Sequence, residues 1–406
     1  MKSGPSLFHG MTLFAAIVFA HVRAVAAEPT QFICFNVSGQ SLPEAFEQVS
    51  RAFPASTNAQ KAVGVAAIFS YLHHGREQTI KQLQGFLRLA RESQMPVVVQ
   101  LDGENWWGAR PELWNWWDAS RAGFSPSNRL NVEWTSWSPD DAIKLAWRNW
   151  GRQIRVLPPP NLMSPAYRKA CDDEMRVLIP LVLDWWKALP ADQRHLLVGI
   201  KLGWESSIGV NAWYYPNGNA LLNQPESDDP KSGLKADELP ARGVTQIGYA
   251  AVKTAGIRNE GAITEADLAE VVRRHLEDLG RLAAGLGVPR DQLFTHVAGW
   301  KENERLYATA LNRFTSPGWS FYQHATNPRD DAGVQAVLRR SDVPHWAAVE
   351  WLFQGPRQTE PWRQALQATL ADPRCRYLCI YNWEGVRDSK EILQAVREVV
   401  QTSIRP

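Results

Sequence analysis

Short apolar segments rich in Val, Ile, Phe and Tyr recur along the chain, and most are followed by a stretch with helical periodicity. Eight segments are predicted as strands: 31–37, 63–72, 96–102, 196–205, 293–300, 319–325, 345–353 and 375–383. Helical stretches are predicted at 42–53, 77–93, 164–189, 245–255, 264–286, 302–314, 331–342, 360–371 and 390–401. This alternation is typical of a parallel sheet covered by helices.

Eight strand-helix units in a chain of 406 residues favour a closed (β/α)8 barrel, a TIM barrel, over an open doubly wound sheet. The glycine-rich phosphate-binding motifs GxGxxG and GxxxxGK[ST] are missing, which also argues against a nucleotide-binding sheet. We expect one catalytic domain, 28–406, with long loop insertions after the third and fourth strands. The first insertion is rich in Trp, and the second is polar and rich in Gly and Pro.

The N-terminus has the pattern of a secretory signal peptide, predicted at residues 1–27. Lys2 precedes an uncharged apolar run at 11–20, and small residues follow at Ala24, Ala26 and Ala27. A run of ten residues is short of the roughly 20 that cross a bilayer, and charged residues interrupt every later apolar segment. The sequence therefore predicts a secreted or periplasmic protein without a membrane span.

Charge and cysteine content exclude some partners. A net charge of +2 and the lack of a Lys/Arg-rich run make nucleic acid an unexpected partner. The four cysteines, Cys34, Cys171, Cys375 and Cys379, are too few and scattered for a disulfide scaffold, and they lack the paired spacing of a zinc site. One or two disulfides are compatible with export, and the sequence leaves their pairing open.

Tryptophan is the unusual component. The chain contains 19 Trp, and nine of them fall between Trp106 and Trp150, many beside polar residues and Gly. Flat indole faces suit the apolar faces of pyranose rings, which indicates a carbohydrate partner. Because these aromatics follow no clear period of two or 3.6, we expect the segment to line a substrate cleft, with about half of its Trp packing onto the barrel.

The ends of the predicted strands carry the candidate chemistry, because barrel enzymes place their sites at the carboxyl ends of the strands. Nearly every strand end delivers a polar or aromatic side chain. The residues predicted to bind substrate are Asn36, His73, Asp102, Glu104, Trp106, Trp107, Trp204, His296, Trp300, Tyr322, Trp351, Trp383 and Glu384.

Glu205 and Glu350 are the predicted catalytic residues. A carboxylate at a strand end is more often a solvated loop residue or a helix cap. Glu350, however, lies inside the apolar run WAAVEWLF, where a buried charge is costly, and Glu205 closes the run LLVGIKLGW. Glycoside hydrolysis needs two carboxylates, and their separation distinguishes retention from inversion of the anomeric configuration. The sequence does not give that separation.

With these positions the chain resembles clan A of the retaining glycoside hydrolases. In this clan the acid/base glutamate ends strand four and the nucleophile ends strand seven, and the resemblance implies these roles for Glu205 and Glu350. Tyr322 and Trp383 fit the clan's aromatic positions on strands six and eight. One departure is Trp204, which stands where many members have Asn contacting the sugar 2-hydroxyl. Asn36, Asp102 and Asn161 are the candidates for that contact.

Two other function classes stay open. His73, His74, His296, Asp102 and Glu104 could instead ligate a metal, although the first strand lacks His-x-His and the Trp excess would stay unexplained. A non-catalytic carbohydrate-binding barrel would keep the aromatic cleft without turnover. No cofactor or metal is predicted, no GxSxG elbow occurs, and the sugar, the linkage and the oligomeric state remain open.

Overall fold

The computed structural model describes residues 1, 30–37, 41–54, 60–149, 153–230, 243–298, 305–322, 326–342 and 345–401. The predicted signal peptide lies outside the described residues except for Met1. Within the described part of the chain, none of the helices has the length and apolarity that a bilayer crossing requires.

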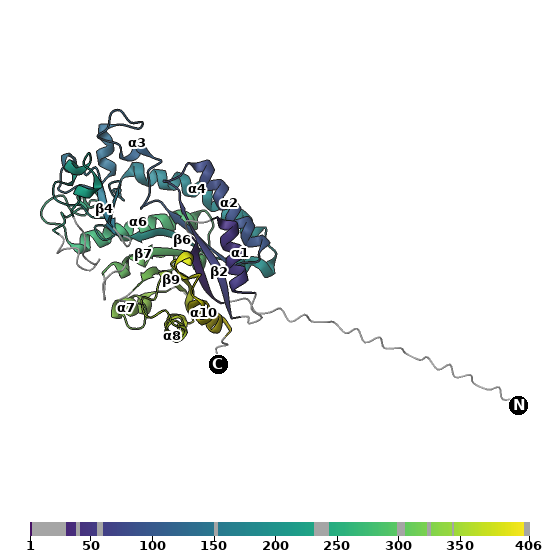
Figure 1. Ribbon diagram of the computed structural model, residues 1–406. Coiled ribbons are helices and arrows are strands. Elements are labelled where there is room, and N and C mark those ends of the chain that lie inside the picture. The colour runs from purple at the N-terminus through teal and green to yellow at the C-terminus, as the bar shows by residue number, and fades with distance from the viewer. Residues whose placement is uncertain are drawn as a thin grey trace.

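Eight parallel strands close into a barrel in the order β1-β10-β9-β8-β7-β6-β3-β2, with helices around it (Figure 1). The predicted TIM barrel is therefore confirmed. The barrel strands are β1 (Gln31–Val37), β2 (Lys61–Ser70), β3 (Val97–Asp102), β6 (Leu197–Ser206), β7 (Leu293–Val297), β8 (Gly318–Phe321), β9 (Trp346–Trp351) and β10 (Cys375–Ile380). A separate antiparallel hairpin is formed by β4 (Ala146–Asn149) and β5 (Gln153–Val156).

Most helices begin where the sequence places a capping side chain. Ser41, Ser164 and Asp331 accept hydrogen bonds from first-turn amides, and Thr264 forms a capping box with Asp267. The helices are α1 (Leu42–Ala52), α2 (Arg76–Glu92), α3 (Pro111–Trp114), α4 (Pro165–Lys187), α5 (Tyr249–Thr254), α6 (Glu265–Gly285), α7 (Ala332–Arg340), α8 (Thr359–Leu370), α9 (Trp383–Val386) and α10 (Lys390–Gln401).

The helix predicted at 302–314 is not formed over its described residues. Only a 3-10 helix, Arg305–Ala310, occurs there. The Asn312 side chain accepts hydrogen bonds from the amides of Phe314 and Thr315 at 2.9 and 3.0 Å. Such side-chain acceptors compete with the helical pattern of backbone hydrogen bonds, so the segment turns toward β8 instead of extending the helix.

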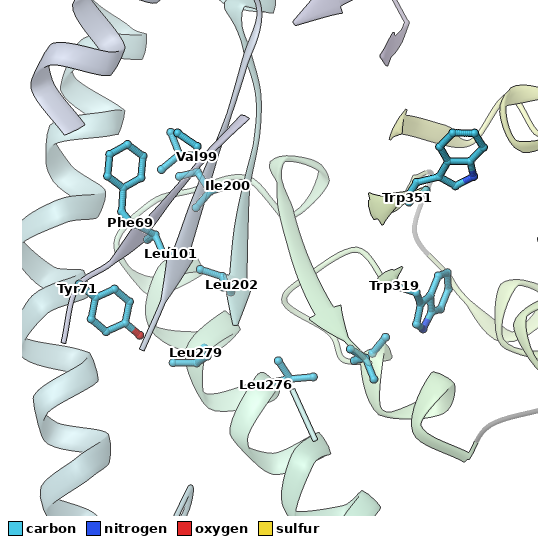
Figure 2. Packing of buried hydrophobic residues seen from close by; sticks show 14 of the residues in the cluster. Phe69, Tyr71, Val99, Leu101, Ile200, Leu202, Leu276, Leu279, Trp319 and Trp351 are labelled. Atoms are coloured by element: carbon cyan, nitrogen blue, oxygen red, sulfur yellow. The ribbon is translucent and has the colours of Figure 1, made fainter. Parts of the chain in front are cut away.

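The core has two layers, one inside the barrel and one between the strands and the helices. Figure 2 shows part of the outer layer, in which Leu101 and Leu202 on the strands accompany Leu276 and Leu279 on α6. The inner layer is apolar in its first part, made by Phe32, Cys34, Ala66, Val98, Val198, Phe294, Ala347, Val349, Tyr377 and Cys379.

Further along the same strands, the inward positions become polar. Cys34 is followed by Asn36, Val98 by Gln100, and Phe294 by His296, and each of these polar side chains is buried. Side chains alternate between the two faces of a strand, so residues two apart point into the same interior. The barrel thus holds an apolar plug with polar groups between it and the carboxyl ends of the strands.

The two long insertions pack on each other. Backbone hydrogen bonds of 2.9 and 3.0 Å join Trp147 to Trp213. The Arg155 guanidinium contacts the Asp229 carboxylate at 2.8 Å. The residues after β3 and those after β6 therefore pack together as one unit.

The four cysteines are all described, all buried, and form no disulfide bond. Cys34 and Cys379 are neighbours across β1 and β10 within the apolar plug. Burial raises the pKa of both thiols well above the ordinary value. They therefore act as small apolar side chains of the core.

A pair of glycine substitutions tests the packing of the barrel. Gly318→Ala should lower the free energy of unfolding by about 1–3 kcal/mol, because its new Cβ would overlap the Thr295 carbonyl oxygen and the Val349 side chain. Gly85→Ala in α2 is the matched control, since nothing lies within 4 Å of its new Cβ, and it should stabilise by up to about 1 kcal/mol. Urea unfolding of both variants measures the difference, and equal stabilities would contradict the described packing at β8.

Candidate active site

The two glutamates singled out in the sequence meet inside the barrel mouth. Glu205 lies on β6, the fourth barrel strand along the chain, and Glu350 lies on β9, the seventh. One carboxylate oxygen of each and one ring nitrogen of His296 lie within 4.8 Å of one another. Glu205 is 2% exposed and Glu350 5%. Strands that are distant in sequence thus bring a carboxylate pair and a histidine together.

The backbone of β6 changes course just before the site. Gly203 has φ 77° and Glu205 has φ 49°, and the pairing of β6 with β7 shifts in register between Leu202 and Ser206. A non-glycine residue with positive φ is strained and is found where structure around it enforces a special direction. A Cβ at Gly203 would lie 2.6 Å from the Glu104 carboxylate and from the Ser206 hydroxyl. Glycine at this position therefore allows the bend that precedes Glu205.

Aromatic donors hold Glu350. The indole Nε1 of Trp204 donates to Oε2 at 3.1 Å, and the Tyr322 hydroxyl donates to Oε1. His296 Nε2 lies 4.0 Å from Oε2. Trp204 thus stands beside one glutamate in sequence and binds the other through its side chain.

Glu205 is held by two neutral donors that sequence reasoning missed. Ser320 Oγ donates to Oε1 at 2.8 Å, and Asn211 Nδ2 donates to Oε2 at 2.9 Å. Ser320 lies in β8, which is short and apolar, and Asn211 lies in the polar insertion after β6. Neither carries a motif, so only the closure of the barrel identifies them.

Lys201, also missed in the sequence, is fully buried beneath the carboxylates. Its Nζ lies 2.8 Å from His296 Nδ1 and 5.5 Å from the centre of the Trp204 ring. Burial lowers the pKa of Lys201, whereas the negative charges of Glu350 and then of Asp102 raise it. A buried ammonium beside two carboxylates is a counter-charge that reduces the cost of burying them.

Burial and mutual repulsion both favour a proton on the glutamate pair. Burial is the larger cause that raises the pKa of Glu350 to about 8, and the charge of Glu205 is the second. Burial also raises the pKa of Glu205, while the bonds from Ser320 and Asn211 oppose the rise. Two close carboxylates cannot both ionise at ordinary cost, so the pair retains one proton near neutral pH.

Other predicted residues are buried in structural hydrogen bonds beside the site. Asn36 Oδ1 accepts from Gln100 at 2.7 Å. Asp102 accepts from the Ser70 hydroxyl at 3.0 Å and from the Glu104 amide at 2.9 Å. Glu104 itself contacts Ser206 Oγ at 2.6 Å and His275 Nε2 at 3.1 Å. Asn161 bonds to Leu130 and Thr254 in the insertion.

Trp351 and Trp383 lie outside the barrel interior. Trp351 follows the inward Glu350, so strand alternation turns it outward, where it contacts Trp362 of α8 edge to face. Trp383 begins α9, packs against Phe35 and donates to Gln48 at 2.9 Å. Tyr381, in contrast, is near enough to the two glutamates to be affected by their charges. Burial raises the pKa of Tyr381, and the charges of Glu350 and Glu205 raise it further.

A cleft of about 520 Å³ lies beside the site, between the two insertions. Its walls include His73, Trp106, Trp107 and Trp117. A smaller recess of about 30 Å³ lies against Glu205. Asn105 lines both spaces, donates to the Trp204 carbonyl at 3.0 Å, and accepts from Arg148 at 2.6 Å. Asn105 therefore links the cleft to the recess that Glu205 lines.

The Trp-rich segment divides between this cleft and the core. Trp107, Trp114, Trp134 and Trp147 are buried. Trp106, Trp116, Trp117 and Trp137 are only partly buried. Glu384 is half-buried on α9, and Trp150 and Trp300 lie outside the described residues. Of these eight described Trp, Trp106, Trp107 and Trp117 line the cleft.

The predicted alternative metal ligands do not meet in one place. Among the described residues, Glu205, His296 and Glu350 have possible metal-ligating atoms within 4.8 Å of one another. Only His296 of this group is among the predicted alternative ligands. Both nitrogens of His296 contact other side chains, Lys201 and Ser320, at 2.8 Å. A positively charged lysine as neighbour disfavours a cation there.

Comparisons with known proteins give similarities of structure. The sequence matches no protein-family model and none of the curated proteins. An exo-β-1,4-mannosidase from Opitutaceae bacterium strain TAV5 is similar at 11% identity and a TM-score of 0.45 over 93% of this chain and 60% of that one. A ruminal family 26 endo-β-1,4-mannanase is similar at 11% identity and a TM-score of 0.43, over 93% and 63%.

A third structure is a family 5 glycoside hydrolase from Prevotella bryantii B14, at 10% identity and a TM-score of 0.42, covering 93% of this chain and 98% of that one. This chain spans less than two thirds of the first two structures. At this level of similarity, the activity of the chain has to be argued from its own residues.

The cost of burying Glu350 predicts a pH-dependent gain in stability when its charge is removed. Its folded pKa is raised from 4.5 to about 8, so the folded state binds this proton more tightly than the unfolded chain, and stability falls as pH rises through that window. Glu350→Gln should therefore increase the free energy of unfolding at pH 8 by on the order of 1 kcal/mol, with little gain at pH 4. Thermal unfolding at both pH values measures this, and a loss of stability at pH 8 would contradict it.

Proposed function

We propose that this chain is a glycosidase that cleaves an oligosaccharide or polysaccharide outside the cytoplasm by a retaining double displacement. Glu350 acts as nucleophile and Glu205 as acid/base. The observation that carries the proposal is the closeness of the two carboxylates, since one oxygen of Glu205 and one oxygen of Glu350 lie within 4.8 Å of each other. A retaining pair has its carboxyl groups about 5–5.5 Å apart, whereas inversion needs about 6.5–9.5 Å to admit a water.

The charge coupling of the pair suits both steps of this mechanism. In the first step, Glu205 carries the one proton that the pair shares and delivers it to the leaving oxygen, while the ionised Glu350 attacks the anomeric carbon. Once Glu350 is esterified, its charge disappears, and with it the repulsion that Glu205 and Glu350 exert on each other. The pKa of Glu205 then falls, so this residue becomes the base that activates water in the second step.

The neighbouring cleft supplies a place for the sugar chain. Trp106 and Trp117 are partly buried and line it, so each presents indole surface on which a pyranose can stack. Asn105, at the junction with the recess, lies next to the route from the cleft toward Glu205. The aromatic walls and the polar junction together support a carbohydrate substrate.

A second candidate is a carbohydrate-binding barrel without turnover. The observation favouring it is the small recess against Glu205, about 30 Å³, beside a cleft of about 520 Å³. Such a protein would bind sugar in the cleft and release no product.

Substitution of the two glutamates separates these candidates. Glu350→Ala should reduce turnover by at least about 10³-fold, because the glycosyl-enzyme cannot form, and added azide should restore part of the rate. Glu205→Ala should still form the glycosyl-enzyme from an activated aryl glycoside and then stall for want of a base. Initial rates and mass spectrometry of the trapped intermediate measure both results.

A matched control for these variants is Glu174→Gln. Glu174 is also buried, but it lies on α4 and pairs with Arg76 at 2.9 Å, and no contact with Glu205 or Glu350 is among its ion pairs with the described residues. It should lower stability and leave turnover per folded molecule unchanged. Near-parental turnover of both Glu205→Ala and Glu350→Ala would refute the assignment, and sugar binding without any product from the parent would favour the second candidate.

The cleft is tested with a pair of tryptophans. Trp106→Ala should weaken the binding of an oligosaccharide that the parent binds by about 10-fold, since a stacked aromatic contributes about 1 kcal/mol or more. Trp186→Ala is the control, because Trp186 is also partly buried but lies on α4 and donates to Arg194. Isothermal calorimetry gives the affinities. Equal affinity for parent and Trp106→Ala, with only a lower melting temperature, would contradict the cleft assignment.

A further inference from the structure

A continuous chain of buried hydrogen bonds leads from Lys201 to Glu205. Lys201 Nζ contacts His296 Nδ1 at 2.8 Å, His296 Nε2 contacts Ser320 Oγ at 2.8 Å, and Ser320 Oγ contacts Glu205 Oε1 at 2.8 Å. The four residues lie on the neighbouring strands β6, β7 and β8. The first three are 0% exposed and Glu205 is 2% exposed.

The chemistry of the groups fixes the direction of this chain. An ammonium group has only donors, so His296 Nδ1 is the acceptor and its Nε2 carries the hydrogen. His296 Nε2 then donates to the Ser320 oxygen, and the serine hydroxyl hydrogen is directed to Glu205 Oε1. Burial first, and the charge of Lys201 second, lower the pKa of His296 well below its usual value, which is consistent with a neutral ring.

We propose that Lys201, His296 and Ser320 form a positioning relay for Glu205. The relay passes the polarisation of the buried ammonium to Oε1 of Glu205, so the acid proton is carried and delivered by Oε2, which also accepts a hydrogen bond from Asn211. This inference rests on the proposed function for the role of Glu205, and it adds three residues that act on Glu205 through hydrogen bonds.

The relay stabilises the ionised form of Glu205, which is the base of the second step. A donor to a carboxylate favours the charged form, and a donor polarised by a cation does so more strongly than an isolated hydroxyl. Ser320 is accordingly the first of the contacts that lower the pKa of Glu205 against the effect of burial. The relay therefore limits how far burial can raise that pKa.

Other charged and titratable groups face the same interior and set the background for a pH measurement. The positive charges of Lys201 and Arg148 lower the pKa of Glu205, and the charge of Glu205 raises the pKa of Glu350. The groups that face Glu205 or Lys201 from the surrounding elements are Glu350, Arg148, Asp102, Tyr322, Tyr381 and Cys379. A variant that removes only the Ser320 hydroxyl leaves all of these charges in place.

The test compares Ser320→Ala with Ser316→Ala. Ser316 is also a buried serine in this part of the chain, but its hydroxyl donates to the Arg290 carbonyl at 3.3 Å. Carbon-13 NMR of glutamate carboxyls, assigned with Glu205→Gln, should show the pKa of Glu205 rising by about half to one pH unit in Ser320→Ala and not in Ser316→Ala. The basic limb of kcat/KM against pH should move upward by the same amount.

A second measurement needs no substitution in the relay. Nitrogen-15 NMR of the parent should show His296 as the neutral tautomer with its hydrogen on Nε2 from about pH 5 to pH 8. A hydrogen on Nδ1, or an unchanged pKa of Glu205 in Ser320→Ala, would overturn the relay. If Glu205→Ala still abolishes turnover in that case, the proposed function stands and only the relay fails. If Glu205→Ala and Glu350→Ala both stay active, the proposed function fails while the NMR titration still decides the relay.

Discussion

Glu205 and Glu350 share the interior of a closed barrel with oxygens within 4.8 Å of each other, and both side chains are almost completely buried. Desolvation and like-charge repulsion make this arrangement costly, so the surroundings have to supply donors and positive charge. Trp204 and Tyr322 donate to one carboxylate, Ser320 and Asn211 to the other, and Lys201 lies beneath both. The polar contents of the barrel follow from this one requirement.

The barrel meets this requirement by dividing its strands into two parts. Inward positions near the start of the strands are apolar, as at Cys34, Val98 and Phe294, and those further along are polar, as at Asn36, Gln100 and His296. The apolar plug excludes water from below, which strengthens every electrostatic contact above it. Because water is excluded, the charge of the buried Lys201 is poorly screened, and it stabilises the two carboxylates more strongly than it would in solvent.

The insertions perform a separate task. They pack on each other through Trp147 and Trp213 and through Arg155 and Asp229, and they line the cleft that Asn105 links to the recess at Glu205. Four of the described Trp in the first insertion are buried supports, while four others keep part of their surface open. The aromatic excess of the sequence therefore serves both the packing of the insertions and the wall of the cleft.

The sequence by itself determined the eight barrel strands, most of the helices around them, and the places of Glu205 and Glu350 on the fourth and seventh strands. It could do so because apolar periodicity and charges inside apolar runs are local signals. Tertiary structure decided the rest. Lys201, Ser320 and Asn211 carry no motif and gain their roles only when β6, β7 and β8 lie side by side. Trp351 and Trp383 were expected near the sugar, but strand alternation and the early end of β10 turn them into the helix layer. The separation of the two carboxylates depends on the strained turn at Glu205, and such a distance arises from barrel closure, which no local pattern records.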